Sequence, residues 1–174
     1  GHFILNNIYY GSKAPLPGEI LEKLNASMRI SLKQETQDAS DGMDIALCRV
    51  EKERREVVFS GGNRNLYHFK NNKDVIEYKG ERKGIGGKPP KISHFENHTF
   101  ILEPNDWMIA YTDGIQDQFG AKGTKFGRQG VNKVMLENFH KSGTEITQAI
   151  KKSLHEHQGD TKQIDDILLI GIKI

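Results

Sequence analysis

Several short apolar runs, each separated from the next by residues that reverse a chain, limit most strongly what this sequence can fold into. Each run is rich in residues that favour strands, and dipeptides such as Gly61-Gly62 and Asn71-Asn72 separate them. Strands joined by such short turns pair in the antiparallel sense. The sequence therefore predicts extensive, mostly antiparallel sheet structure. The expected strands cover residues 43–50, 56–60, 65–70, 74–78, 92–102 and 106–112.

Helical periodicity precedes and follows these strands. Apolar residues recur every three or four positions over residues 17–32, and Pro17 suits the first turn of a helix. The same spacing returns in two segments nearer the C-terminus, where Ser142 and Glu145 are typical of a capping box. The order of these elements predicts an α+β sandwich with helices outside the sheets. The apolar positions of the two later segments are Val131, Val134, Met135 and Phe139, then Ile146, Ala149, Ile150 and Leu154.

The two ends of the chain carry apolar runs of different kinds. Residues 3–10 start abruptly and are predicted to be the end of a helix. Residues 167–174 are almost continuously apolar, which is typical of a central strand covered on both faces. We therefore expect the last strand to lie inside the sheet.

Composition excludes several functional classes. The 174 residues are 36% hydrophobic, so we expect one core and a single domain over residues 1–174. The 25 basic and 23 acidic residues nearly cancel, which does not favour nucleic acid as a partner. Cys48 is alone, so it forms neither a disulfide nor a cysteine metal site and is expected to be a buried, unreactive thiol. Without a bilayer-spanning run or a signal peptide, we expect a cytoplasmic protein with no membrane insertion.

Two acidic segments stand at the ends of predicted strands. Tyr111-Thr112-Asp113-Gly114 ends an apolar strand with a carboxylate and then a glycine, which lets the backbone turn and a ligand approach. Gln163-Ile164-Asp165-Asp166 places two like charges before the last strand, where they are costly unless a cation or hydrogen-bond donors compensate them. Such carboxylates suit a hard divalent cation. The alternative is structural: Asp-Gly is a common turn dipeptide, and Asp165 and Asp166 would then cap a turn in solvent.

A series of short motifs runs through nearly the whole chain in a fixed order. The motifs are PGEILEKLN at residues 17–25, DGMDIAL at 41–47, FSGGNRNLY at 59–67, DWMIAYTDG at 106–114, DQFG at 117–120, KFG at 125–127 and DDILLIG at 165–171. Any one of them is weak, but their order and spacing resemble the bacterial SpoIIE class of PPM-type (protein phosphatase 2C-like) serine/threonine phosphatases.

The resemblance implies metal-dependent hydrolysis of phosphoserine or phosphothreonine in a signalling protein of the kind that regulates sigma factors. In the complete domain two Mn²⁺ or Mg²⁺ ions activate the attacking water, and no side chain acts as the nucleophile. Matched residue by residue, Asp113 and Asp165 are the metal ligands, and Asp166 contacts the ligands rather than the ion. Gly114 and the turn Gly61-Gly62-Asn63 flank the site, although the strand reversal alone would select glycine at that turn. The implied partner is a phosphorylated protein, such as an anti-sigma-factor antagonist.

The chain departs from the family pattern at its start. A complete member begins with a strand that carries Gly-Asp and continues with one that ends in Asp-x-x-Gly-His-Gly, and neither is present here. Those strands supply the carboxylates that bridge the two ions. Gly1-His2 is either what remains of the second motif or an expression tag. The resemblance therefore implies a PPM-type α-β-β-α sandwich truncated at its N-terminus, inactive or weakly active as it stands, with open sheet edges that favour a homodimer.

Two other interpretations stay open. The first is a regulatory or scaffold domain that keeps the same fold but has lost its metal site. The second is an unrelated α+β binding domain, which would make the ordered motifs a coincidence. Acidic strands encoded upstream in the full-length gene would separate the enzyme from the scaffold.

Overall fold

The computed structural model describes residues 15–34, 41–87 and 94–173. The chain divides into two compact units, one from residues 1–66 and 78–101 and the other from residues 67–77 and 102–174. The single domain expected from the chain length stays a prediction. The predicted helix end at residues 3–10 and the dipeptide Gly1-His2 lie outside the described residues.

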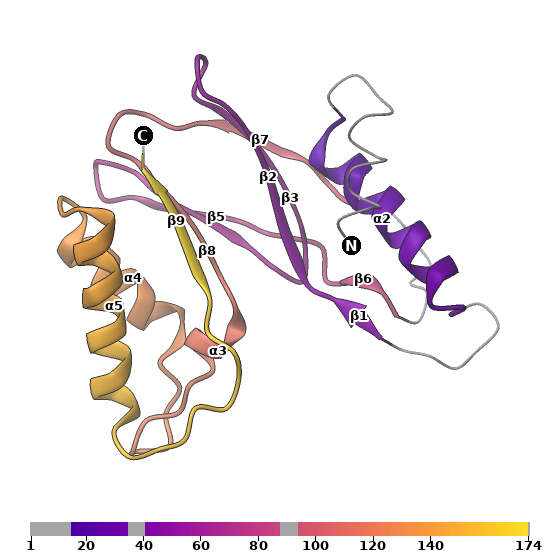
Figure 1. Cartoon of the computed structure of the whole chain (residues 1–174). Helices are drawn as coiled ribbons and strands as arrows, with labels where there is room; N and C mark the ends of the chain where they lie inside the picture. Colours follow the sequence, from indigo (N-terminus) through magenta and orange to yellow (C-terminus); the bar gives the residue numbers. More distant parts are fainter. Residues whose placement is uncertain (1–14, 35–40, 88–93, 174) are drawn as a thin grey trace. The chain divides into compact units, whose positions relative to one another are not determined.

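The first unit is a helix packed on antiparallel strands (Figure 1). Its elements are α2 (Pro17–Ser31), β1 (Gly42–Met43), β2 (Ile45–Glu51), β3 (Glu56–Gly62), β6 (Ile85–Gly86) and β7 (His98–Ile101). A three-stranded sheet has the order β2-β3-β7, and a separate ladder joins β1 to β6. All of these pairs are antiparallel, and α2 contacts β2, β3 and β6. The antiparallel pairing expected from the short turns is confirmed in this unit.

Helix α2 forms where the periodicity predicted it. Pro17 lies in its first turn, and the Glu19 carboxylate accepts a hydrogen bond from the Leu16 backbone N–H at 3.0 Å. This bond satisfies one of the backbone donors that a helix start leaves open. The apolar face of the helix forms a buried cluster with Ile85 and Phe95, which fixes the helix on the strands.

The predicted strand over residues 43–50 is divided at Asp44. The Asp44 carboxylate accepts a hydrogen bond from Asn63 Nδ2 at 3.0 Å and pairs with the Arg64 guanidinium at 3.1 Å. These contacts hold Asp44 outside the ladders, and β1 and β2 on either side of it belong to different sheets. The expected strand over residues 92–102 is also shorter, because β7 begins only at His98.

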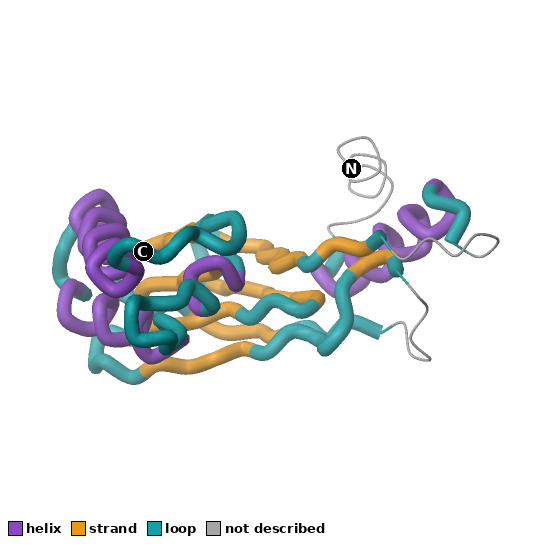
Figure 2. Tube along the Cα trace, turned by 90° about the horizontal axis from the view of Figure 1, so that it is seen from below, coloured by secondary structure: helices purple, strands orange, loops and turns teal. Residues whose placement is uncertain are grey.

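The second unit is a four-stranded sheet with two long helices beside it (Figures 1 and 2). Its elements are β4 (Leu66–Phe69), β5 (Val75–Tyr78), β8 (Trp107–Tyr111), α3 (Asp113–Gln116), α4 (Gly127–Asn138), α5 (Gly143–Gln158) and β9 (Leu169–Lys173). The strand order is β5-β4-β8-β9, and β8 pairs antiparallel with both of its neighbours. Sheet and helices enclose one apolar core.

The two long helices confirm the sequence prediction closely. Ser142 and Glu145 form the expected capping box: the Glu145 carboxylate accepts from the Ser142 N–H at 3.0 Å, and the Glu145 N–H donates to Ser142 Oγ at 3.4 Å. The hydrogen bonds from Ser142 lower the pKa of Glu145. All the predicted apolar positions except Ala149, which is partly buried, are buried in the core: Val131, Val134, Met135, Phe139, Ile146, Ile150 and Leu154.

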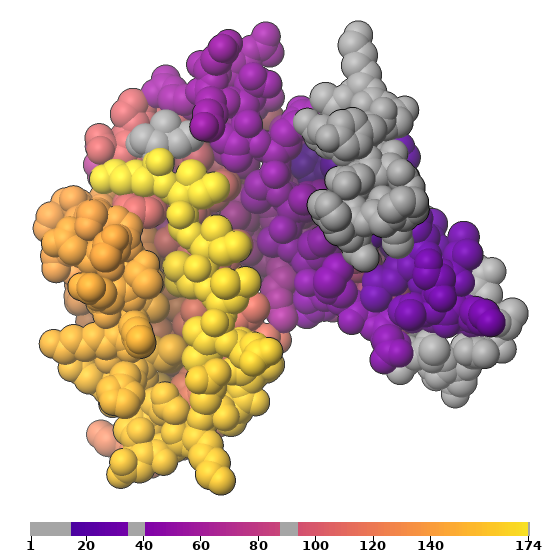
Figure 3. All heavy atoms as spheres, viewed as in Figure 1, coloured from indigo at the N-terminus to yellow at the C-terminus, as the bar shows by residue number. Residues whose placement is uncertain are grey.

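The prediction of a central last strand was wrong. Strand β9 is the edge of the sheet as far as the structure describes the chain, and Ile170 and Ile172 are 57% and 39% exposed. Only alternate residues face the core, where Leu169 packs and Gly171 lies beside Trp107. A continuous apolar run does not show which of its two faces will be covered. Figure 3 shows this C-terminal segment, in yellow, at the surface.

A buried contact between a histidine ring and a carboxylate anchors the turn that leads into β8 and the turn that follows β4. The Asp106 carboxylate and the His68 ring are each only 1% exposed, and His68 Nε2 lies 2.7 Å from Asp106 Oδ2. The same carboxylate accepts from the backbone N–H groups of Asn71 at 2.8 Å and Glu103 at 3.0 Å. One buried side chain therefore fixes two turns that are far apart in the sequence.

Two expectations from composition were that the Cys48 thiol is unreactive and that the chain does not insert into a membrane. Burial raises the pKa of the Cys48 thiol to about 12, so it stays protonated at neutral pH, in keeping with an unreactive role. Among the described residues, no helix combines the length and the apolar character that a bilayer crossing requires.

We expect Asp106→Ala to lower the free energy of unfolding by at least about 1–3 kcal/mol, because it removes the carboxylate that accepts from two backbone N–H groups and contacts a buried histidine ring. Urea unfolding followed by circular dichroism measures this. The matched control is Asp160→Ala, at an exposed position, which should change the stability by less than about 0.5 kcal/mol. Equal effects of the two substitutions would contradict the anchoring role of Asp106.

Candidate metal centre

The two acidic segments meet at one end of the β8–β9 pair. Asp113 follows β8 as the first residue of α3, and Asp165 precedes β9 by a few residues. Because the strands are antiparallel, with Tyr111 opposite Leu169, the end of β8 lies beside the start of β9. The structure therefore brings together two segments that are about 50 positions apart in the sequence.

Thr112 joins these segments with a single hydroxyl group. Its Oγ1 donates to the carbonyl oxygen of Asp166 at 2.8 Å and accepts from the N–H of Leu168 at 2.9 Å. The Thr112 N–H also donates to the carbonyl oxygen of Leu168 at 3.0 Å. Sequence reasoning did not assign this role to Thr112, and the only available signal was a hydroxyl residue directly before Asp-Gly at a strand end.

Position 114 requires glycine, because the backbone of a distant segment occupies the space that a side chain there would need. A Cβ at this position would lie 2.3 Å from the carbonyl oxygen of Asp166 and 3.2 Å from that of Asp165. No ordinary Cβ contact is that short, so only glycine fits. The group that approaches this glycine is the backbone of the segment carrying the second carboxylate, and the predicted approach of a ligand stays a prediction.

The carboxylates themselves differ in environment. Asp113 is half-buried, whereas Asp165 is exposed and its Oδ1 accepts from the N–H of Asp166 at 2.7 Å. The Asp166 side chain is exposed as well, and its backbone groups make the local bonds. Asp117 pairs with Lys125 at 3.0 Å on the surface.

These oxygens fit part of a site for a hard divalent ion. Mn²⁺ and Mg²⁺ prefer carboxylate and water oxygens, and Asp113 and Asp165 would supply two carboxylates from neighbouring turns. Within the described residues, no cluster of three or more His, Cys, Asp or Glu side chains is arranged to hold a metal. Two carboxylates are fewer than a pair of ions requires, so the metal role of Asp113 and Asp165 stays a prediction.

The prediction that Gly61-Gly62-Asn63 forms a turn was wrong: Gly61 and Gly62 are the last residues of β3, where they pair with Ala46 and Ile45, and Asn63 follows the strand. A Cβ on Gly61 would lie 2.2 Å from the carbonyl oxygen of Arg64, and one on Gly62 would lie 2.8 Å from that of Lys83. Asn63 has a positive φ of 53° and donates its N–H to the carbonyl oxygen of Glu81 at 2.7 Å. Chain packing alone therefore accounts for these residues, and a place beside the metal stays a prediction.

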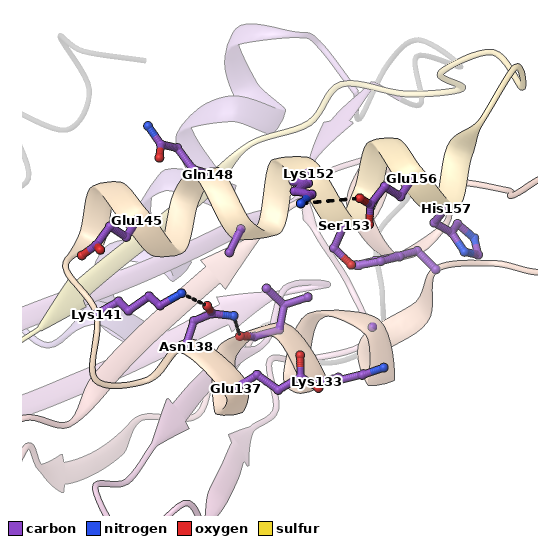
Figure 4. A pocket seen from close by; sticks show the side chains of 14 residues that line it. Lys133, Glu137, Asn138, Lys141, Glu145, Gln148, Lys152, Ser153, Glu156 and His157 are labelled. Atoms are coloured by element: carbon purple, nitrogen blue, oxygen red, sulfur yellow. Dashed lines mark hydrogen bonds and ion pairs between the residues drawn. The ribbon is translucent and has the colours of Figure 1, made fainter.

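A groove of about 780 Å³ lies between α4 and α5 (Figure 4). Its charged side chains are of both signs, and some of them pair locally, as Lys152 does with Glu156 at 3.9 Å. A surface of balanced charge is not suited to binding phosphate, and we assign it no catalytic role. The charged residues that line it are Lys133, Glu137, Lys141, Glu145, Lys152 and Glu156, with His157 at one end.

A model of the stage II sporulation protein E (SpoIIE) family matches residues 4–174. The chain belongs to the SpoIIE family. The family assignment made from the ordered motifs is thus confirmed, and so is the mixed fold of helices and antiparallel sheets, which the solved structures share.

Among curated proteins, IcfG of Synechocystis is 29% identical over 103 residues, which cover 56% of this chain and 16% of IcfG. Among solved structures, the SiaA-PP2C domain of Pseudomonas aeruginosa is 26% identical with a TM-score of 0.85, and the match covers 99% of this chain and 66% of that one. The SpoIIE-family chain therefore spans about a sixth of the curated relative and less than two thirds of the SiaA domain chain.

Two more distant structures support the fold alone. The PP2C phosphatase domain of Bacillus subtilis SpoIIE, solved with a fragment of its regulatory domain, is 16% identical with a TM-score of 0.74 and is matched over 99% of this chain and 48% of its own. RsbX, solved in complex with magnesium, is 16% identical with a TM-score of 0.65, matched over 96% and 69%.

We expect Gly114→Ala to reduce the free energy of unfolding by about 1–3 kcal/mol, because the new methyl group must displace the backbone of Asp165 and Asp166. Urea unfolding provides the measurement. Gly143→Ala is the control, since its Cβ would meet Trp107 at 3.5 Å, an ordinary contact, and should cause no loss. A Gly114→Ala protein as stable as the wild type would show that the two segments are not in contact.

Proposed function

We propose that this chain is a module of a metal-dependent protein serine/threonine phosphatase that acts in a bacterial signalling protein of the sigma-factor regulatory type. Membership of the SpoIIE family supports the proposal. The observation that carries it is the meeting of the Asp113 and Asp165 segments at one end of the β8–β9 pair, joined through Thr112. Acidic groups on neighbouring turns of a fixed scaffold are a suitable basis for holding a cation.

Asp113 and Asp165 would hold the ion, and Mn²⁺ or Mg²⁺ fits their oxygen chemistry. When bound, such ions lower the pKa of water and neutralise phosphate oxygens. Asp166 orients Asp165 through its backbone N–H, and Gly114 leaves room for that segment. RsbX has been solved with magnesium, and the SpoIIE phosphatase domain of Bacillus subtilis after a manganese presoak.

The proposed substrate is a protein that carries phosphoserine or phosphothreonine, such as an anti-sigma-factor antagonist in the cytoplasm. One structure of the same fold, with 17% identity and a TM-score of 0.60, comes from work on the bacterial stressosome. Strands with the Gly-Asp and Asp-x-x-Gly-His-Gly motifs are absent from residues 1–174, so this chain by itself should be inactive or weakly active. Full activity is a property we propose for the full-length gene product.

A second candidate function is a regulatory or scaffold domain of the same fold without catalysis. The observation in its favour is that the described residues offer no group of three or more metal-binding side chains. The two proposals differ in whether the full-length gene product hydrolyses a phosphate ester when Mn²⁺ is added.

We expect Asp113→Asn and Asp165→Asn each to abolish Mn²⁺-dependent hydrolysis of p-nitrophenyl phosphate by the full-length gene product, because each removes a negative ligand oxygen. Circular dichroism should show an unchanged fold, and chelation of the metal should mimic both substitutions in the wild type. Asp160→Asn, at an exposed position outside the site, is the control and should retain activity. Undiminished turnover in either site variant would remove the assignment, and an inactive wild type would favour the scaffold.

A further inference from the structure

The segment that carries Asp165 is exposed to solvent, yet one fully buried side chain holds it. Residues 162–168 are exposed throughout, so apolar packing does little to fix their position. Gln118, directly after the C-cap of α3, is 0% exposed and reaches this segment from inside the second unit. Water cannot replace a hydrogen bond that a buried amide loses, so the contacts of this side chain are costly to break.

The Gln118 amide nitrogen makes the contacts that matter. Nε2 donates to the carbonyl oxygens of Phe119 and Lys162, each at 3.0 Å, and lies 3.4 Å from Thr161 Oγ1. Two carbonyl acceptors can be served only by an NH₂ group, so the orientation of the amide is determined. Gln118 Oε1 is buried and has no hydrogen-bond partner among the described residues. The nitrogen alone therefore ties the loop after α3 to the start of the exposed segment.

Thr161 strengthens the same junction. Its Oγ1 lies 2.7 Å from two carbonyl oxygens, those of Phe119 and Gln158, and its single hydroxyl hydrogen is donated to one or shared between the two. The Gln158 side chain in turn donates to the Thr161 carbonyl oxygen at 2.8 Å. The end of α5, the loop after α3 and the start of the exposed segment are thus bonded to one another.

The segment is consequently held at two points, one on each side of Asp165. Upstream, Gln118 binds Lys162; downstream, Thr112 binds the backbone of Asp166. Gln118 is also bonded through α3 to the first acidic segment, because the N–H of its neighbour Asp117 donates to the carbonyl oxygen of Asp113 at 2.8 Å. Few residues separate the two points of attachment, which restricts where the Asp165 carboxylate can lie.

We propose that Gln118 is a positioning residue that fixes the Asp165 segment relative to Asp113. It thereby sets the affinity of these two carboxylates for a divalent cation. The inference rests on the proposed function, in which these two carboxylates are metal ligands. Gln118 does not touch the ion in this arrangement, and it acts only through the backbone of Lys162.

The test uses Gln118→Glu, which keeps the shape of the side chain but turns an oxygen toward two carbonyl oxygens. Gln148→Glu, on the exposed surface of α5, is the matched control for the added charge. In the metal-free full-length gene product, hydrogen–deuterium exchange at the amides of Asp166 and Leu168 should become about tenfold faster. The Mn²⁺ concentration for half-saturation, measured by calorimetry, should rise by about 10- to 100-fold. The KM for p-nitrophenyl phosphate at saturating Mn²⁺ should stay unchanged.

A second variant keeps the proposal testable if Gln118→Glu does not fold. Thr161→Val removes only the hydroxyl hydrogen bonds of the same junction. It should also raise the exchange rate and the half-saturating Mn²⁺ concentration, each by a smaller factor than Gln118→Glu. Exchange that stays at the wild-type rate, or faster exchange with unchanged Mn²⁺ affinity, would overturn the positioning role. Asp165→Asn distinguishes failure of the proposed metal site from failure of the positioning role of Gln118. If this variant binds Mn²⁺ as the wild type does, the proposed metal site is wrong, whatever the exchange data show for Gln118.

Discussion

The antiparallel pairing of β8 with β9 is the constraint on which the candidate centre depends. Its register sets Tyr111 opposite Leu169, so the residues that follow one strand must lie beside those that precede the other. Every contact between the two acidic segments follows from that register, including the double use of the Thr112 hydroxyl and the space left by Gly114. A slip of one residue would turn these side chains to the opposite face of the sheet.

Buried polar side chains determine the turns of the second unit. Asp106 and Gln118 are almost completely inaccessible to solvent, and each binds backbone groups of two separate segments. Turns offer little apolar surface for packing, so their position is specified by hydrogen bonds to the interior. The exposed segment around Asp165 is the extreme case, because it depends on a few polar contacts rather than on the core.

Prediction from the sequence succeeded where the signal is local. The spacing of apolar residues gave α4 and α5 with their buried faces, and Ser142 with Glu145 gave the cap. It failed for β9, because an apolar run does not reveal what covers it. Thr112 and Gln118 were missed since their partners lie 54 and 44 positions away, and no pattern links residues at such distances. The adjacency of the acidic segments follows from topology, but the metal roles of Asp113 and Asp165 stay predictions.

The open face of β9 has a consequence for handling the isolated chain. Three exposed aliphatic side chains stand in alternate positions, Leu168 just before β9 and Ile170 and Ile172 within it, and β9 is an edge strand among the described residues. Such a pattern can recruit other chains into intermolecular sheets. Lys173 carries the only charge in the strand, and its ammonium lies 5.6 Å from the Trp107 ring on the core side. Among the described residues of this strand no charged side chain interrupts the apolar stripe, a pattern that favours aggregation at high protein concentration.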